Sequence, residues 1–120
     1  MFNWFKKKTN QELENKVIDY SNIDSNEKAL SFYKKGELSK IYLMPLEFGG
    51  QDIPMNSLYV PEFVQTFKER FDKMIEQLLI DGKNLSYSAE PEYKGKSFIP
   101  SKLIISVNGD SELKETINIW

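Results

Sequence analysis

The sequence predicts an α+β fold, with helices packed on a largely antiparallel sheet. One long segment has the apolar period of an amphipathic helix, and three later segments alternate apolar and polar residues as half-buried strands do. Short turns between these strands favour antiparallel neighbours. With 120 residues, of which 40% are hydrophobic, the chain can form one core. We therefore expect a single domain over residues 9–120, preceded by an extension over residues 1–8.

Two short helices are expected before the first strand. The first follows a capping box near residue 9, and the second spans about residues 25–35 after a similar capping pattern. Gly36 stands where a left-handed residue commonly ends a helix. The capping pairs are Thr9 with Glu12 and Asp24 with Glu27, and the apolar face of the first helix is Leu13, Val17 and Tyr20.

Two extended segments are expected next. Residues 41–46 are apolar on both alternating faces, which predicts a central strand covered on both sides, in the same sheet as the C-terminal strands. Residues 58–60 form a second extended segment that stops at Pro61. Proline suits the first turn of a helix, so we expect a helix to begin there.

The stretch EFGGQDIP, residues 47–54, lies between these two segments. Consecutive glycines can let backbone amides approach a phosphate, but such a loop also needs a lysine or a helix directly after it. Neither follows Gly50, and Asp52 lies where a phosphate would bind. We therefore interpret the stretch as a turn whose glycines supply positive φ angles.

The strongest periodic signal predicts a long helix over residues 61–81, ended by Gly82. Phe67 and Phe71 are expected to be core positions on its apolar stripe. Asp72 and Glu76 lie opposite this stripe, where we expect a solvated face of mixed charge. The stripe comprises Phe63, Val64, Phe67, Phe71, Met74, Ile75, Leu78 and Leu79.

Three strands are expected after the long helix, over about residues 85–89, 103–107 and 117–119. Apolar and polar side chains alternate in each of them, so each has one face for the core and one for solvent. Turns are expected at residues 94–96 and 108–110, where glycine stands between polar residues.

The chain has neither cysteine nor histidine. Disulfides and thiolate zinc sites are therefore excluded, as are Ser-His-Asp, Cys-His and HExxH chemistries. We expect no catalytic residues, no cofactor and no metal site, and hence a protein that is not an enzyme. A cleft in which two buried carboxylates, or Tyr87 and a lysine, converge would instead favour an enzyme.

Three pairs of carboxylates lie close together in the sequence and could form an acid pair or a metal site. None has the spacing of a calcium-binding loop, so we interpret them as solvated surface acids. The pairs are Glu47 with Asp52, Glu90 with Glu92, and Asp110 with Glu112.

Charge is unevenly distributed along the chain. Three of its 16 basic residues lie in the opening MFNWFKKK, whereas all 18 acidic residues follow that opening. The domain is therefore mildly acidic, and nucleic acid is a poor partner for it. The opening suits either a mobile cytosolic extension or a contact with a membrane surface, and its apolar part is too short for a signal peptide. We expect a cytoplasmic protein.

Residues 88–102, SAEPEYKGKSFIPSK, combine aromatic, basic and proline residues. Such side chains on a stiff loop are typical of a binding surface, because little entropy is lost when they are ordered. The alternative is a hairpin connection whose Tyr93 and Phe98 close the edge of the core. The positions that we expect to contact a partner are Asp52, Tyr93, Lys94, Lys96 and Phe98.

The stretches IYLMPLEFGGQDIPMNSLYVP and YSAEPEYKGKSFIPSKL resemble a family of small, uncharacterised bacterial proteins associated with toxin-immunity neighbourhoods. The resemblance covers about residues 40–120 and supplies no catalytic residues. It implies an immunity protein that blocks a toxin domain by covering its active surface. We therefore expect a non-catalytic protein-binding module. The alternatives are a small-molecule enzyme or ligand-binding protein that uses carboxylate, tyrosine or lysine groups, and a membrane adaptor that uses residues 1–8.

Overall fold

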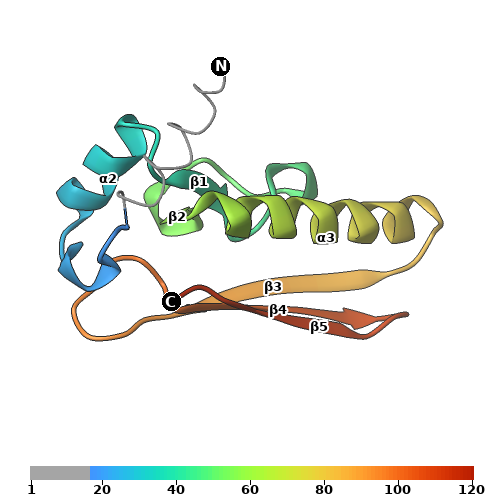
Figure 1. Cartoon of the computed structure of the whole chain (residues 1–120). Coiled ribbons are helices and arrows are strands. Elements are labelled where there is room, and N and C mark those ends of the chain that lie inside the picture. The colour runs from blue at the N-terminus through green and yellow to red at the C-terminus, as the bar shows by residue number, and fades with distance from the viewer. Residues whose placement is uncertain (1–16) are drawn as a thin grey trace, which may run out of the picture.

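The long helix α3 (Glu62–Ile80) organises the fold. In the computed structural model, which describes residues 17–120, α3 lies on a three-stranded antiparallel sheet and beside a separate two-stranded antiparallel sheet (Figure 1). The short helix α2 (Asn26–Lys34) lies at the end of the molecule where α3 begins. The described residues form one α+β domain, which confirms the expected fold class.

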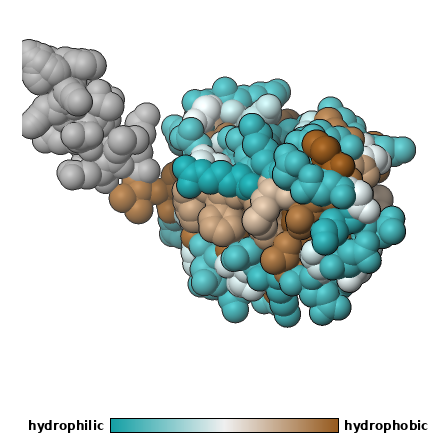
Figure 2. Space-filling view, turned by 90° about the vertical axis from the view of Figure 1, so that its right-hand side faces the viewer, coloured by the Kyte–Doolittle hydropathy of each residue, from teal (hydrophilic) through white to brown (hydrophobic). Residues whose placement is uncertain are grey.

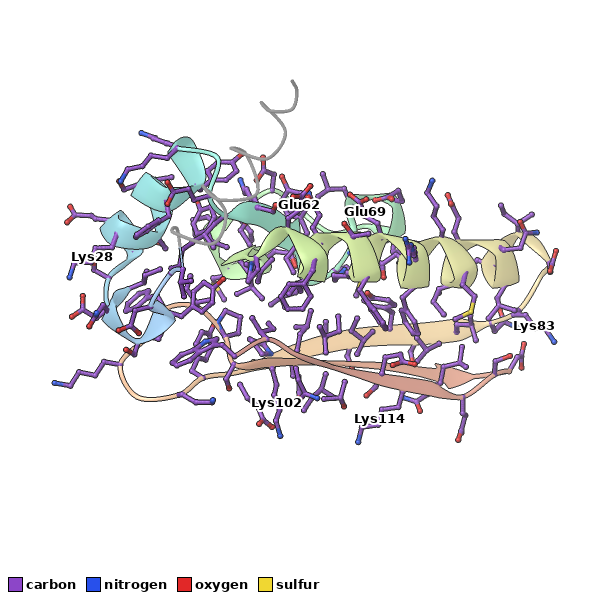
Figure 3. All side chains as sticks on the ribbon, in the orientation of Figure 1. Lys28, Glu62, Glu69, Lys83, Lys102 and Lys114 are labelled. Carbon is purple, nitrogen blue, oxygen red and sulfur yellow. The ribbon has the colours of Figure 1, made fainter. Side chains whose placement is uncertain are left out.

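The three-stranded sheet has the order β3 (Leu85–Glu92), β4 (Lys102–Gly109), β5 (Leu113–Asn118). All three strands form as expected; β3 and β4 reach beyond the predicted bounds, whereas β5 begins earlier than predicted and ends at Asn118, before the predicted Ile119. Leu103, Ile105 and Val107 of β4 are buried against α3, as period-2 alternation requires. Lys102 and Lys114 instead point away from α3, on the opposite face of the sheet (Figure 3).

The two-stranded sheet differs from the expectation. The strand β1 (Ser39–Tyr42) pairs with β2 (Ser57–Val60), and among residues 17–120 it joins no other strand, so the prediction of one sheet including residues 41–46 was wrong. The reason lies at Met44, where the Asn56 side chain accepts from the backbone N–H at 2.8 Å and donates to the carbonyl at 3.0 Å. These side-chain bonds take the place of strand pairing at Met44, so β1 ends at Tyr42 and the chain enters the turn before β2.

The stretch EFGGQDIP is a turn between β1 and β2, as expected. Gly49 has a φ of +101° and ends a 3₁₀ turn, η2 (Leu46–Phe48). Gly50 does not have a positive φ and is required for a different reason. A Cβ atom there would lie 2.0 Å from the carbonyl oxygen of Met44.

The helix α2 confirms the second expected helix, although its N-cap is one residue later than the predicted Asp24. The Ser25 hydroxyl accepts from the backbone N–H of Lys28 at 3.1 Å. Asp24 pairs instead with the Lys28 ammonium group at 2.8 Å. Most of the first expected helix, like the opening extension, lies outside the described residues, and Tyr20–Asn22 is a short 3₁₀ turn, η1.

The apolar stripe of α3 is only partly buried. Phe71 is a core residue, 6% exposed, whereas Phe67 is 41% exposed, so the prediction that Phe67 is a core position was wrong. Phe63 and Phe67 line a groove beside the edge strand β5, because the stripe is wider than the sheet that covers it. Figure 2 looks at the end of the molecule where α3 ends, and it shows apolar side chains in a band between hydrophilic ones.

The core has two clusters. The larger one lies between α3 and the two sheets, and the smaller one joins Ile23, Ala29, Leu38 and Ile99. Trp120 packs against both clusters. None of the helices within residues 17–120 is both long and apolar enough to cross a bilayer.

Candidate functional site

A surface pocket of about 430 Å³ gathers residues from three separate parts of the chain. We call it the aromatic pocket. One wall comes from β1, β2 and the turn between them, a second from α2, and the third from the loop after β3. Its main lining residues are Lys40, Asp52, Ile53, Pro54, Tyr59, Tyr93 and Phe98.

The loop after β3, residues 93–101, is held firmly in place. The Phe98 N–H donates to the Ile23 carbonyl at 2.7 Å, and the Ser97 hydroxyl donates to the Tyr20 carbonyl at 2.6 Å. At its far end the Ser101 N–H donates to the Glu92 carbonyl at 2.6 Å. The loop backbone is therefore held in place before any partner binds, which lowers the entropy cost of binding.

The aromatic pocket brings together three of the five residues predicted to contact a partner, Asp52, Tyr93 and Phe98. Tyr93 and Phe98 are 48% and 49% exposed, so they do not close the core as the alternative interpretation required. The core role in this loop belongs to Ile99 and its neighbour Pro100, both fully buried.

Asp52 forms an ion pair with Lys40 at 3.0 Å on the rim of the aromatic pocket. The hydrogen bond from Lys40 lowers the pKa of the Asp52 carboxyl, and the same bond raises the pKa of Lys40. Burial raises the pKa of the Tyr93 hydroxyl. At neutral pH the pocket therefore offers an aromatic surface beside a charge pair whose net charge is zero.

The two predicted lysines do not line the aromatic pocket. The Lys94 ammonium group lies 4.8 Å from the centre of the Trp120 ring, in a cation–π contact. Lys96 is exposed and lies near enough to Asp24 to contribute to lowering the pKa of that carboxyl. Both lysines are on the same loop as Tyr93 and Phe98, outside the pocket itself.

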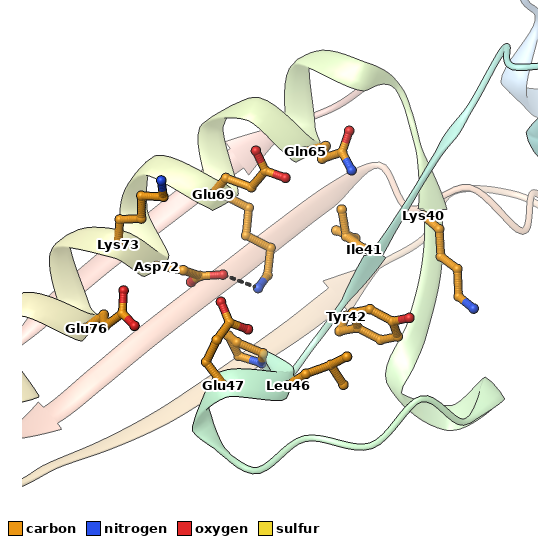
Figure 4. A pocket seen from close by; sticks show the side chains of 12 residues that line it. Lys40, Ile41, Tyr42, Leu46, Glu47, Gln65, Glu69, Asp72, Lys73 and Glu76 are labelled. Atoms are coloured by element: carbon orange, nitrogen blue, oxygen red, sulfur yellow. Dashed lines mark hydrogen bonds and ion pairs between the residues drawn. The ribbon is translucent and has the colours of Figure 1, made fainter.

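A second pocket of about 430 Å³ lies between α3, β1 and the turn η2 (Figure 4). We call it the Lys68 pocket, because a buried lysine lines it. Lys68 is 3% exposed, and its ammonium group pairs with Asp72 at 2.7 Å. The Tyr87 hydroxyl donates to the other oxygen of Asp72, and the Tyr87 ring centre lies 5.4 Å from the Lys68 nitrogen. Asp72 therefore joins α3 to β3.

Burial governs the ionisation of this cluster. It lowers the pKa of Lys68, and the ion pair with Asp72 opposes that change. Burial also raises the pKa of Tyr87, and the hydrogen bond to Asp72 raises it further. Tyr87 therefore keeps its proton far above neutral pH.

The sequence pointed to Tyr87 with a lysine, but it did not identify Lys68 as that lysine or Asp72 as their shared partner. The prediction that Asp72 belongs to a solvated face was wrong, because β1 and η2 cover that side of α3. A signal was present in the spacing, since Val64, Lys68, Phe71 and Ile75 recur at the positions of one helical face. A lysine at such a position predicts a buried cation that needs a partner, and Asp72 stands four residues later.

The paired carboxylates are not gathered into a larger acidic site. Within the described part of the chain, no group of three or more acidic, histidine or cysteine side chains could hold a metal ion. Asp52 pairs with Lys40 and not with Glu47, and Asp110 accepts from the backbone N–H of Asn84 at 2.8 Å, where it fastens the start of β3.

Comparison with known proteins identifies no relative of this chain. No family model matches the chain, and neither the curated proteins nor the solved structures contain a significant match to it.

Proposed function

We propose that this protein is a non-catalytic, cytoplasmic protein-binding module, and that the aromatic pocket receives a side chain of its partner. One observation carries the proposal. Asp52, Tyr93 and Phe98, which are selected from the sequence as contact residues, come from distant stretches and line one pocket. Aromatic anchors in a preformed depression are the usual centres of protein interfaces.

The partner that we propose is a toxin domain whose active surface is covered on binding. The family resemblance over about residues 40–120 supports a toxin, and the acidic balance of residues 9–120 suits a basic surface. The anchored loop over residues 93–101 supports tight and specific binding, because its backbone needs no ordering. Lys94 and Lys96 then serve as charged contacts around the pocket.

A small-molecule enzyme or ligand-binding protein is the second candidate, favoured by the convergence of Lys68 and Tyr87 on Asp72. Burial lowers the pKa of Lys68, although the ion pair with Asp72 opposes that change, and the raised pKa of Tyr87 keeps its hydroxyl protonated. Tyr87 is therefore not prepared to take a proton from a substrate near neutral pH, and Lys68 is engaged in its ion pair with Asp72. The arrangement suits ligand binding better than catalysis.

Affinity capture from cells that naturally make the protein, read out by mass spectrometry, tests the proposal. We expect one stoichiometric toxin-like protein on the wild type and its loss from the Tyr93→Ala/Phe98→Ala variant. The matched control is Phe63→Ala/Phe67→Ala, which removes two similarly exposed aromatic side chains beside β5. This control should retain the partner.

Two results would overturn the proposal. One is a partner that the Tyr93→Ala/Phe98→Ala variant still captures at wild-type yield. The other is the absence of any captured protein together with a co-purifying metabolite, which would favour the second candidate.

A further inference from the structure

We propose that the Lys68 pocket is a separate binding site for a small neutral polyhydroxy compound of the saccharide type. The site adjoins the aromatic pocket at Lys40, which lines both, but it opens between α3, β1 and η2 and does not include the loop after β3. The proposal does not depend on whether the protein also binds a toxin. It follows from the hydrogen-bonding groups and the charges that line the pocket.

The first argument concerns the donors of Lys68. An ammonium group carries three N–H donors, and a buried donor is nearly always paired. Within residues 17–120, the ammonium group of Lys68 donates to Asp72 alone, although the residue is only 3% exposed. Because Lys68 lines the pocket and its ammonium group otherwise meets, among these residues, only the Tyr87 ring in a cation–π contact, a donor remains for an oxygen atom placed there.

The second argument concerns the acceptors that face this lysine. Glu47 points toward the Lys68–Asp72 ion pair (Figure 4) and lies close enough to favour the charged form of Lys68. The two side chains nevertheless make no hydrogen bond or ion pair with each other in the described structure. A group that fills this space must accept from Lys68 and donate to Glu47, and a hydroxyl group can do both.

The third argument excludes charged ligands. The lining contains three lysines, Lys40, Lys68 and Lys73, against four carboxylates. An anion would add to this acidic excess, and its bond to Lys68 would compete with Asp72. A simple cation could bind the carboxylates but would leave the buried donors of Lys68 without an acceptor. A neutral ligand with several hydroxyl groups satisfies both sides, and Gln65 and Glu69 on α3 offer it further polar contacts.

Titration of the ¹⁵N-labelled full chain, followed by amide chemical shifts, tests the site. The probes are glucose and maltose as neutral ligands, spermidine as the cation and citrate as the anion. We expect saturable shifts with a neutral sugar, centred on Glu47, Lys68 and Asp72. Spermidine and citrate should give weaker responses.

Two variants make the result specific to the pocket. Glu47 is exposed, so Glu47→Ala should fold normally and should bind the sugar about tenfold more weakly, as expected for the loss of one hydrogen bond to a charged group. Glu90→Ala removes a carboxylate that is likewise exposed, on β3 and outside the pocket, and should bind as the wild type does. A chemical-shift fingerprint that matches the wild type away from the substitution confirms that both variants are folded.

Several outcomes would overturn the inference. Sugars that give no saturable shift, or shifts that centre on Tyr93 and Phe98, would remove the Lys68 pocket as their site. Unchanged affinity in Glu47→Ala would do the same. Tighter binding of spermidine or citrate than of either sugar would refute the neutral ligand class.

Discussion

Lys68 is the residue that departs most from the apolar pattern of α3. It stands between Val64 and Phe71 on the buried face, and its side chain is 4% exposed. A buried charge is tolerated only with a partner, and the Asp72 carboxylate, 14% exposed, supplies one. Tyr87 then occupies the second oxygen of Asp72. The three side chains form one unit, so a change to any of them alters the others.

Removal of either charge should destabilise the protein strongly. Asp72→Asn leaves the buried ammonium group of Lys68 without its carboxylate, and we expect a loss of about 3 kcal/mol or more in the free energy of unfolding. Lys68→Met should cost a similar amount, because Asp72 then remains charged and unpaired. The double variant Lys68→Met/Asp72→Leu should cost less than the sum of the two, since it removes both charges. Urea denaturation measures all three, and additive losses would contradict a coupled pair.

Tyr87 should make the stability fall at high pH. Its folded-state pKa is raised above the ordinary value of 10.0, so the unfolded chain releases this proton at a lower pH than the folded protein does. Stability from this group is therefore complete below pH 10 and is lost as the pH rises above it, by up to about 1.4 kcal/mol per pH unit. Lys68, whose pKa is lowered by burial, acts in the opposite direction.

Tyr87→Phe isolates the tyrosine contribution, because Lys68 remains in both proteins. The difference in unfolding free energy between wild type and Tyr87→Phe should be constant from pH 7 to about pH 9 and should shrink above pH 10. Urea titrations at several pH values measure it. A difference that stays constant up to pH 11 would show that Tyr87 is not held in its protonated form.

At the scale of single elements, sequence patterns were most reliable where they report local geometry. The helix α3 and the strands β3 and β4 form where periodicity predicts them, whereas most of β5 precedes the predicted strand. Sequence patterns failed where the extent of an element depends on contacts between residues far apart in the sequence. The apolar run over residues 41–46 reads as a central strand, but its length as a strand is decided by the side chain of Asn56.

Phe67 and Phe71 both lie on the apolar stripe of α3, but only Phe71 is buried. Phe71→Ala should lower the unfolding free energy by about 3 to 5 kcal/mol, because the side chain fills the core between α3 and the sheets. Phe67→Ala should cost roughly 1 kcal/mol, the ordinary cost for a substitution that opens no core cavity. The chemical change is the same on the same helix, so each variant is the other's control. Equal losses would contradict the arrangement of α3 over the sheet.

At the scale of the whole molecule, the sequence identified candidate side chains but not their arrangement. Tyr93 and Phe98 were identified by composition, and their meeting with Asp52 depends on how the loop after β3 is fastened near Ile23. The Lys68 pocket could not be assembled in the same way. Its wall from Glu47 requires the turn between β1 and β2 to fold over α3, and no local pattern reports that contact.

Trp120 connects the two core clusters and so links the aromatic pocket to the main sheet. Its indole N–H donates to the Ile99 carbonyl at 3.0 Å, and its ring lies 6.1 Å from that of Tyr20 and 4.8 Å from the Lys94 ammonium group. Ile99 belongs to the smaller cluster, whereas Ile119, next to Trp120, belongs to the larger one.

Trp120→Ala should therefore loosen the smaller cluster before the larger one. We expect faster amide hydrogen exchange at Phe98 and Ile99, because the Trp120 ring no longer packs against the cluster that shields their hydrogen bonds. Amides of β4, such as that of Ile105, should keep most of their protection, since α3 still covers them. Trp120→Phe is the matched control, which retains the aromatic packing without the N–H donor. Equal acceleration at Phe98 and Ile105 in Trp120→Ala would mean that the two clusters open as one unit, and the aromatic pocket would then be as stable as the sheet itself.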